Sequence, residues 1–229
     1  MALNTYAAIK TAVADWSYNG GGVTAALVGT DFFPQVQSMM YMGHGDKETE
    51  RRTGMAAIPP LRISDMVDSA TITPATGGII TISSQVDAGW LEFIEMVPTS
   101  NSAVSINYVP PWDFRKNAHA IQSTAAPQYI YTIEGDSLYL APASVQPIAA
   151  KWYQKFTAVS GDSDTDWIIL NAPQVYLDGC LMLACAYTQD EREAAFRAKF
   201  AAGIKGLNLN DQRGRSSGSV KVSRPRVVV

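Results

Sequence analysis

The sequence predicts an α+β protein in which helices from both ends of the chain form one bundle, with an antiparallel β-rich domain inserted between them. Two observations support this fold class. Apolar residues recur at helical spacing near both ends, and they alternate with a period of two in the middle. A third observation, the absence of a periodic apolar face near the C-terminus, predicts an extended arm. The expected helical domain comprises residues 1–58 and 164–213, the β-rich domain residues 59–163, and the arm residues 214–229.

Two helices are expected before residue 59. Asn4 can cap the first, and the apolar face of this helix consists of Tyr6, Ile9, Val13 and Trp16. Residues 20–22 are glycines and end the helix, because glycine holds helical order only at an entropic cost. Thr30 is the expected cap of the second helix, which ends at Gly43. Residues 46–52 are charged and are expected to form a loop or a surface helix.

Short strands are expected between residues 59 and 163. Residues 70–73 and 79–82 flank a turn-forming segment and predict one hairpin. Residues 129–133 and 138–140 flank Glu134-Gly135-Asp136 and predict a second hairpin, to which residues 151–156 add a third strand. Residues 93–97 and 104–109 are further strand candidates.

Two more helices are expected after residue 164. Pro173 suits a first helical turn, and the run to Tyr187 has polar side chains only at Gln174 and Asp178, which predicts a helix buried on nearly all sides. Thr188 followed by Glu191 matches a capping box, so the last helix is expected to begin there. Its apolar face consists of Phe196, Phe200, Ile204 and Leu207.

Charge is distributed unevenly along the chain. The formal net charge is −3, and charged residues make up 17% of the chain, against about 25% in average soluble domains. Residues 212–229 contain five basic residues and no acidic one, so the rest of the chain carries a net charge of about −8. This balance argues against nucleic-acid binding by the chain as a whole, which needs an excess of basic residues.

The two cysteines, Cys180 and Cys185, would lie about 140° apart on a helix, so we expect buried thiols and no disulfide. This usage fits a reducing compartment. The N-terminus lacks the pattern of a secretion signal, and no uninterrupted apolar run is long enough to predict a membrane span.

No motif predicts an enzyme, a cofactor or a metal site. His44 and His119 lie in glycine-rich or polar stretches and are interpreted as surface or turn residues. Residues 214–218 match a nucleophile elbow only formally, because no strand is expected before them and no histidine follows. Residues 162–166 resemble the start of a calcium loop but lack its later glycine and glutamate, which favours a turn before a helix over a weak cation site.

The C-terminal arm is the segment in which the sequence points to a partner. Its valines alternate with or follow basic residues, as in a strand that adds to the edge of another protein's sheet while its arginines meet acidic groups. A solvated tail is the alternative. The candidate partner-binding residues are Arg213, Arg215, Lys221, Arg224 and Arg226.

Several stretches resemble the head-to-tail adaptor proteins of short-tailed phages. Residues 129–142, YIYTIEGDSLYLAP, resemble the "YYTI…LRLAP" hairpin of that family. Residues 166–177, DWIILNAPQVYL, resemble its "NWLLxNAPDLYLYG" stretch, and Asp190-Glu191-Arg192 with the helix that follows also resembles it. Residues 6–16, YAAIKTAVADW, are similar to its opening "YxxLxxxVxxWL" helix. The second helix departs from the family's charged "AEARINRxLR" run, and residues 59–120 contain little that matches.

The resemblance implies a structural virion protein at the head–tail junction, assembled in the host cytoplasm. It further implies a ring of twelve copies whose arms reach the portal protein and whose lower face receives the tail tube or nozzle protein, while DNA passes through the lumen without specific binding. Trp112, in a Pro-Pro-Trp-Asp corner, is a further candidate for subunit or tail contact.

The alternative hypothesis is a receptor- or carbohydrate-binding module of a virion spike or fibre. In that case Trp90 and Trp112, placed in loops of the β-rich domain, would stack on sugars.

Overall fold

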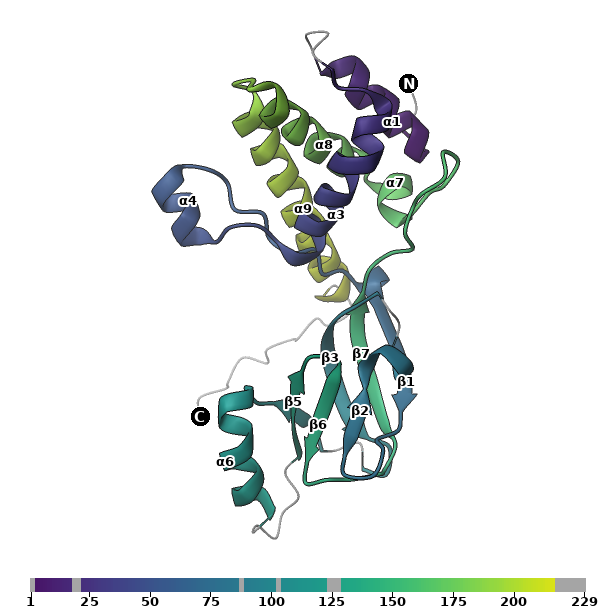
Figure 1. The fold of residues 1–229 in the computed structure, drawn as a ribbon, viewed down its shortest axis with the longest axis vertical. Helices are drawn as coiled ribbons and strands as arrows, with labels where there is room; N and C mark the ends of the chain where they lie inside the picture. The colour runs from purple at the N-terminus through teal and green to yellow at the C-terminus, as the bar shows by residue number, and fades with distance from the viewer. Residues whose placement is uncertain (1–2, 18–21, 87–88, 102–103, 123–128, 217–229) are drawn as a thin grey trace, which may run out of the picture. The chain divides into compact units, whose positions relative to one another are not determined.

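The computed structural model describes residues 3–17, 22–86, 89–101, 104–122 and 129–216. The chain divides into two compact units, one formed by Met1–Ser64 with Thr157–Val229 and the other by Asp65–Phe156. The first is helical and the second is built around β-strands (Figure 1). We call them the helical unit and the β unit. Their mixed content of helix and sheet agrees with the predicted α+β class.

The helical unit is organised around four longer helices: α1 (Tyr6–Trp16), α3 (Phe33–Met42), α8 (Pro173–Thr188) and α9 (Glu193–Ser216). Shorter elements connect them: α2 (Ala25–Leu27), the π-helical turn η1 (Val28–Phe32), α4 (Lys47–Thr53) and α7 (Trp167–Asn171). Helix α9 runs through residues 214–216, which were expected to begin the extended arm. The remaining arm residues, 217–229, lie outside the described residues.

Helix α8 is the central helix of this unit and packs against α1, α3 and α9. It is buried from Val175 to Cys185 with the single exception of position 183, which confirms the prediction of a helix enclosed on nearly all sides. Cys180 and Cys185 are both buried with free thiols. Gly179 permits the close packing, because a Cβ atom there would lie 2.6 Å from Val36 Cγ1 of α3.

The starts of the two N-terminal helical stretches differ from the expected ones. Thr5 rather than Asn4 caps α1, and Thr5 Oγ1 accepts a hydrogen bond from the Ala8 N–H at 3.2 Å. The next stretch begins with Thr24 as the cap of α2, and it continues through Thr30 without a break to the end of α3. Asn4 and Thr5 are adjacent and both can cap, and Thr24 precedes Thr30 by six residues, so residue type alone does not identify the start.

The predicted capping box at the start of the last helix is also wrong. Thr188 is instead the last residue of α8, and its hydroxyl donates to the Ala184 carbonyl at 2.9 Å. Gln189 then adopts a left-handed conformation (φ 55°), and α9 begins at Glu193.

The β unit contains two sheets, one with strand order β1–β7–β3 and the other with order β2–β6–β5–β4. The strands are β1 (Val67–Ile72), β2 (Ile79–Thr81), β3 (Trp90–Pro98), β4 (Ile106–Tyr108), β5 (Tyr129–Glu134), β6 (Ser137–Ala141) and β7 (Ile148–Gln154). A 3₁₀ turn, η2 (Ser64–Met66), precedes β1, and the unit also contains the helices α5 (Ile82–Gln85) and α6 (Pro111–Gln122). Residues from both sheets, including Trp152, Ile72 and Leu138, form one buried core.

The β5–β6 hairpin is confirmed: Tyr131 lies opposite Leu140, and Gly135 has the positive φ of 62° that the turn requires. Two other predicted pairings are wrong. Residues 70–73 and 79–82 do not form a hairpin, because β1 pairs with β7 and β2 pairs with β6. Strand β7 does not extend the β5–β6 hairpin but joins β1 and β3. Strands β4 and β5 are parallel, so the unit is not wholly antiparallel.

Candidate assembly surfaces

Large apolar side chains are exposed on both units. In the helical unit Trp16, Leu170 and Tyr187 are 57%, 62% and 58% exposed, and in the β unit Trp112 is 74% exposed. An exposed apolar side chain becomes significant where it forms part of a surface that a partner covers. The candidate site of this chain is therefore a set of surfaces, of which three have a defined structure.

The first surface is the C-terminal part of α9, which contains Arg213 and Arg215. Arg215 forms an ion pair with Asp211 one turn earlier. Asp211 also accepts a hydrogen bond from the Ser64 N–H at 2.9 Å. Partial burial acts to raise the pKa of Asp211, but hydrogen bonds from Ser64 and Arg215 bring it below its ordinary value. This carboxylate stays ionised and fixes the helix end to the segment that precedes β1.

One turn earlier on α9, Asn208 strengthens the same attachment. Its Oδ1 accepts from the Arg62 N–H at 2.8 Å, and its Nδ2 donates to the Pro60 carbonyl at 2.9 Å. The helix therefore arrives at Ser216 in a fixed position. Of the five predicted partner-binding residues, the structure places Arg213 and Arg215 on this helix, and Lys221, Arg224 and Arg226 lie outside the described residues.

The second surface is a protrusion formed by residues 43–58, which we call the α4 protrusion. A β-bridge between His44 and Ile58 closes its base, and Figure 1 shows α4 standing away from α3 and α9. Asp46 caps α4 by accepting from the Thr49 N–H at 2.7 Å, and Gly54 ends it with a φ of 70°. None of the residues of α4 is buried, so its helical form depends on its own capping groups and not on packing.

Arg197 fixes the returning side of the protrusion. It is only 8% exposed, and its Nε donates to the Ala56 carbonyl at 3.0 Å. This contact joins α9 to a segment that lies 141 residues away in the sequence. His44 is exposed, as expected of a surface or turn residue, and it lines a pocket of about 480 Å³ beside Lys205.

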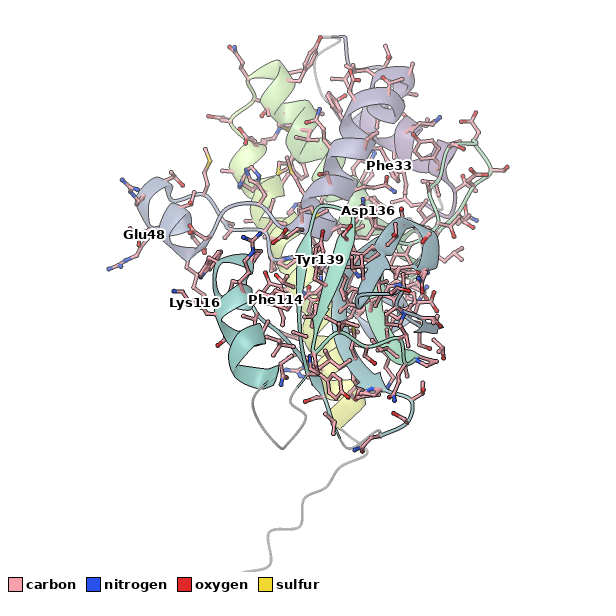
Figure 2. The ribbon with its side chains drawn as sticks, turned by 60° about the horizontal axis from the view of Figure 1, so that its bottom comes forward. Phe33, Glu48, Phe114, Lys116, Asp136 and Tyr139 are labelled. Carbon is pink, nitrogen blue, oxygen red and sulfur yellow. The ribbon has the colours of Figure 1, made fainter. Side chains whose placement is uncertain are left out.

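The third surface belongs to the β unit and includes Trp112. This residue was expected in a Pro-Pro-Trp-Asp corner, but it lies in the first turn of α6. The sequence analysis did not predict this helix. Phe114 and Ala118 are half-buried, whereas Trp112, Arg115 and Lys116 are exposed. Figure 2 shows Phe114 on the side of α6 next to Tyr139 and Lys116 on the opposite side. We call Trp112, Arg115 and Lys116 the outer face of α6.

The β unit also contains a groove of about 350 Å³, which we call the aromatic groove. It is lined by Trp90, Leu91, Glu92, Phe93, Tyr108, Tyr131 and Ile133. Its rings contact one another at an angle: the centroid distance is 5.2 Å for the tilted pair Trp90–Phe93 and 5.5 Å for the edge-to-face pair Tyr108–Tyr131. Burial, with smaller contributions from Tyr108 and Glu92, raises the pKa of Tyr131.

Trp90 is therefore not the loop residue that the carbohydrate hypothesis assumed. It begins strand β3 and is half-buried against Phe93. Strand β3 has irregular pairing between Trp90 and Glu92 and again between Phe93 and Glu95. Such bulges redirect side chains at a sheet edge. Among the described residues, the Trp90 Nε1 atom is one of the few buried polar atoms without a hydrogen-bond partner.

The acidic segment that resembles a calcium loop is occupied by structural contacts. Asp162 forms an ion pair with Lys10 at 2.6 Å, and Asp164 accepts from the N–H groups of Ser160 and Gly161. Asp166 caps α7 by accepting from the Ile169 N–H at 2.8 Å. The part of the chain that the structure describes holds no group of three or more potential metal ligands.

Within the described residues, no helix is both long enough and apolar enough to cross a membrane.

Tyr176 donates to Asp166 at 2.6 Å, and both side chains are buried in the helical unit. This pair therefore stabilises the α7–α8 corner.

Comparison with known proteins identifies the family. A family model described as SU10 adaptor protein matches residues 4–224, which includes the helical ends and the middle segment that the motifs left unmatched. A search of curated proteins finds no match. The family match confirms the resemblance to phage head-to-tail adaptors, which are structural virion components and are not known as enzymes. The chain belongs to the SU10 adaptor protein family.

Proposed function

We propose that this protein is a head-to-tail adaptor that forms a ring, joins the portal to the tail and surrounds the DNA channel. The observation that carries the proposal is the family match over residues 4–224. In this proposal the ring contains twelve copies, assembles in the host cytoplasm and is found at the head–tail junction of the virion. Its partners are the portal protein on one side and the tail tube or nozzle protein on the other.

Exposed apolar side chains support self-assembly. Trp16 ends α1, Leu170 lies on α7 and Tyr187 lies near the end of α8, and each is more than half exposed in the single chain. Burying a large apolar side chain contributes about 1.5–3 kcal/mol. A ring that covered these residues in every copy would gain stability without any change in the core of the helical unit.

The charge distribution supports passage of DNA through the ring. The chain without its last 18 residues carries a net charge of about −8. Negative charge around a channel repels the phosphate backbone, so DNA slides without binding. The basic residues are concentrated at the C-terminus, which in this proposal faces the portal and not the lumen.

The proposed portal contact is made by Arg213, Arg215, Lys221, Arg224 and Arg226. The fixed end of α9 supports this role, because a rigid helix delivers the following segment to one place. A contact through arginines would be charge-assisted and would weaken as salt is raised.

Truncation after Ser216 tests the portal contact while leaving α9 intact. The expected result is loss of co-sedimentation with purified portal protein, while circular dichroism shows an unchanged helical unit. Undiminished attachment of the truncated protein would overturn the role of the arm.

A matched pair of charge reversals separates a specific contact from net charge. Replacing Lys221, Arg224 and Arg226 by glutamate should abolish portal attachment. Replacing Lys155, Lys199 and Lys205, which are exposed and lie outside the three candidate surfaces, by glutamate changes the net charge equally and should leave attachment intact. Equal loss in both variants would show that attachment responds only to net charge.

A further inference from the structure

We propose that the outer face of α6 docks into the aromatic groove of a neighbouring copy, with Trp112 as the inserted side chain. The inference rests on the proposed ring, and it names the residues that would join one β unit to the next. Three features of the β unit support it. A tryptophan is exposed on a helix, aromatic rings line a groove, and the charged residues on the same helix face as the tryptophan are opposite in sign to the one that lines the groove.

The outer face of α6 has the character of an interface. At about 100° per residue, Trp112, Arg115 and Lys116 fall within one arc of about 100°, and Phe114 and Ala118 lie on the opposite side. Trp112 is the most exposed of the large apolar side chains, at 74%. Tryptophan and arginine are the residues most enriched at the energetic centres of protein interfaces. The helix thus presents an aromatic side chain flanked by two positive charges.

The aromatic groove has the complementary character. Its volume of about 350 Å³ is near the lower end of the range of about 300–1,000 Å³ for ligand pockets, which suits one large side chain. Trp90, Phe93, Tyr108 and Tyr131 offer ring edges and faces to an incoming indole.

Charge favours the same pairing. The carboxylate of Glu92, an exposed residue, lines the groove. Arg115 and Lys116 flank Trp112 on α6. Opposite charges on the two surfaces orient the partners and discriminate against the reverse arrangement.

A second copy of this chain is the occupant that the observations favour. Trp112 does not fill the groove of its own copy, because three quarters of its surface is exposed. If α6 of each copy enters the groove of the next copy and not of the same partner, the contact is head-to-tail, and contacts of this type generate rings when the rotation closes. A sugar in the groove would leave the exposed face of α6 without a role.

Cysteine cross-linking of the full-length chain tests the contact. Two variants are made, Glu92→Cys and Lys116→Cys, both at exposed positions and both retaining Trp112. The native Cys180 and Cys185 are buried and should not take part. Under mild oxidation the mixture should give a disulfide-linked dimer that neither variant gives alone.

Val145→Cys is the matched control, because Val145 is 60% exposed in the same unit but lies outside the groove. A mixture of Val145→Cys with Lys116→Cys should give only the background yield from random collisions. Equal dimer yields in the two mixtures would overturn the proposal.

Trp112→Ala, added to the Lys116→Cys chain, should lower the specific yield at least about tenfold, since centrally buried tryptophans dominate interface energies. Trp112→Phe should retain part of the yield. An unchanged cross-linking yield with Trp112→Ala would contradict the role of this side chain. The proposal would also be overturned if the chain formed no specific cross-link and instead bound a sugar through Trp90.

The portal assay is read separately. Cross-linked copies that fail to bind the portal would count against the proposed function alone. Portal binding without the specific cross-link would count against the α6 contact alone.

Discussion

Gly179→Ala is expected to destabilise the helical unit, although alanine is the better helix former. Gly179 lies in the middle of α8, where a Cβ atom would be 2.6 Å from Val36 Cγ1 and 3.1 Å from Phe200 Cε2. Real Cβ contacts are not this short, so a neighbour must move. Val36 and Phe200 are both 0% exposed, and a valine in a helix has essentially one favourable rotamer. Neither side chain has space into which it can withdraw.

The magnitude follows from two opposing effects. Overpacking of a buried site costs about 1–3 kcal/mol, and the rigid surroundings here favour the upper part of that range. Replacing glycine by alanine inside a helix gains about 1 kcal/mol. The net expectation is a loss of about 2 kcal/mol in the free energy of unfolding, measured by urea titration of the helical circular-dichroism signal.

Gly206→Ala is the matched control. Gly206 lies in α9, and a Cβ atom there would meet nothing within 4 Å. The same substitution should therefore stabilise the chain by about 1 kcal/mol. In a Val36→Ala background, where space has been made, Gly179→Ala should cost less than in the wild type. A Gly179→Ala protein as stable as the wild type would refute the packing argument.

Further predictions concern the buried polar and thiol groups. Burial raises the pKa of Asp166 above 3.8 despite hydrogen bonds from Tyr176 and the Ile169 N–H. The folded chain then holds this proton more tightly than the unfolded chain, so stability falls as the pH rises from 3.8 through the raised pKa. In urea titrations between about pH 3 and pH 7, the free energy of unfolding of Asp166→Asn should rise relative to that of the wild type as the pH increases. A difference in this free energy that stays constant with pH would contradict the prediction. Tyr176→Phe removes a buried hydrogen bond and should cost about 1–3 kcal/mol in the same assay. Cys180 and Cys185 should resist a thiol reagent until urea is added, and fast labelling of the folded chain would show that they are accessible.

Features with a local cause could be predicted from the sequence. The β5–β6 hairpin follows from Glu134-Gly135-Asp136 between two apolar runs, and Gly135 takes the positive φ that this turn needs. The burial of α8 follows from a run with only two polar side chains. Even these two pair with each other, because Gln174 Nε2 donates to Asp178 at 3.0 Å.

Features with a distant cause could not be predicted. Strand β7 lies closest in sequence to the β5–β6 hairpin, yet it pairs with β1 and β3, where Trp152 enters the common core. An alternating pattern shows which side chains are buried, but it does not show which strand lies alongside.

The same distinction applies to the candidate surfaces. Trp112 was selected because it follows two prolines and precedes an aspartate. Helix α6 was not predicted, because Pro110-Pro111 suggests a corner. Proline in the first turn is in fact compatible with a helix, and α6 begins at Pro111. The aromatic groove combines β3, β4 and β5, so no single stretch of sequence reveals it.

The pairing of β1 with β7 has a consequence for how this protein can change. Val67, just after the chain enters the β unit, lies opposite Tyr153, just before the chain leaves it. Antiparallel partners have Cα atoms about 5 Å apart, so the entry and exit of the unit are adjacent. A unit with adjacent ends can be excised, or exchanged for another of any size, with only a short linker left in its place. The outer face of α6 and the aromatic groove can therefore change in sequence together with the surfaces that they contact, while the helical unit stays the same.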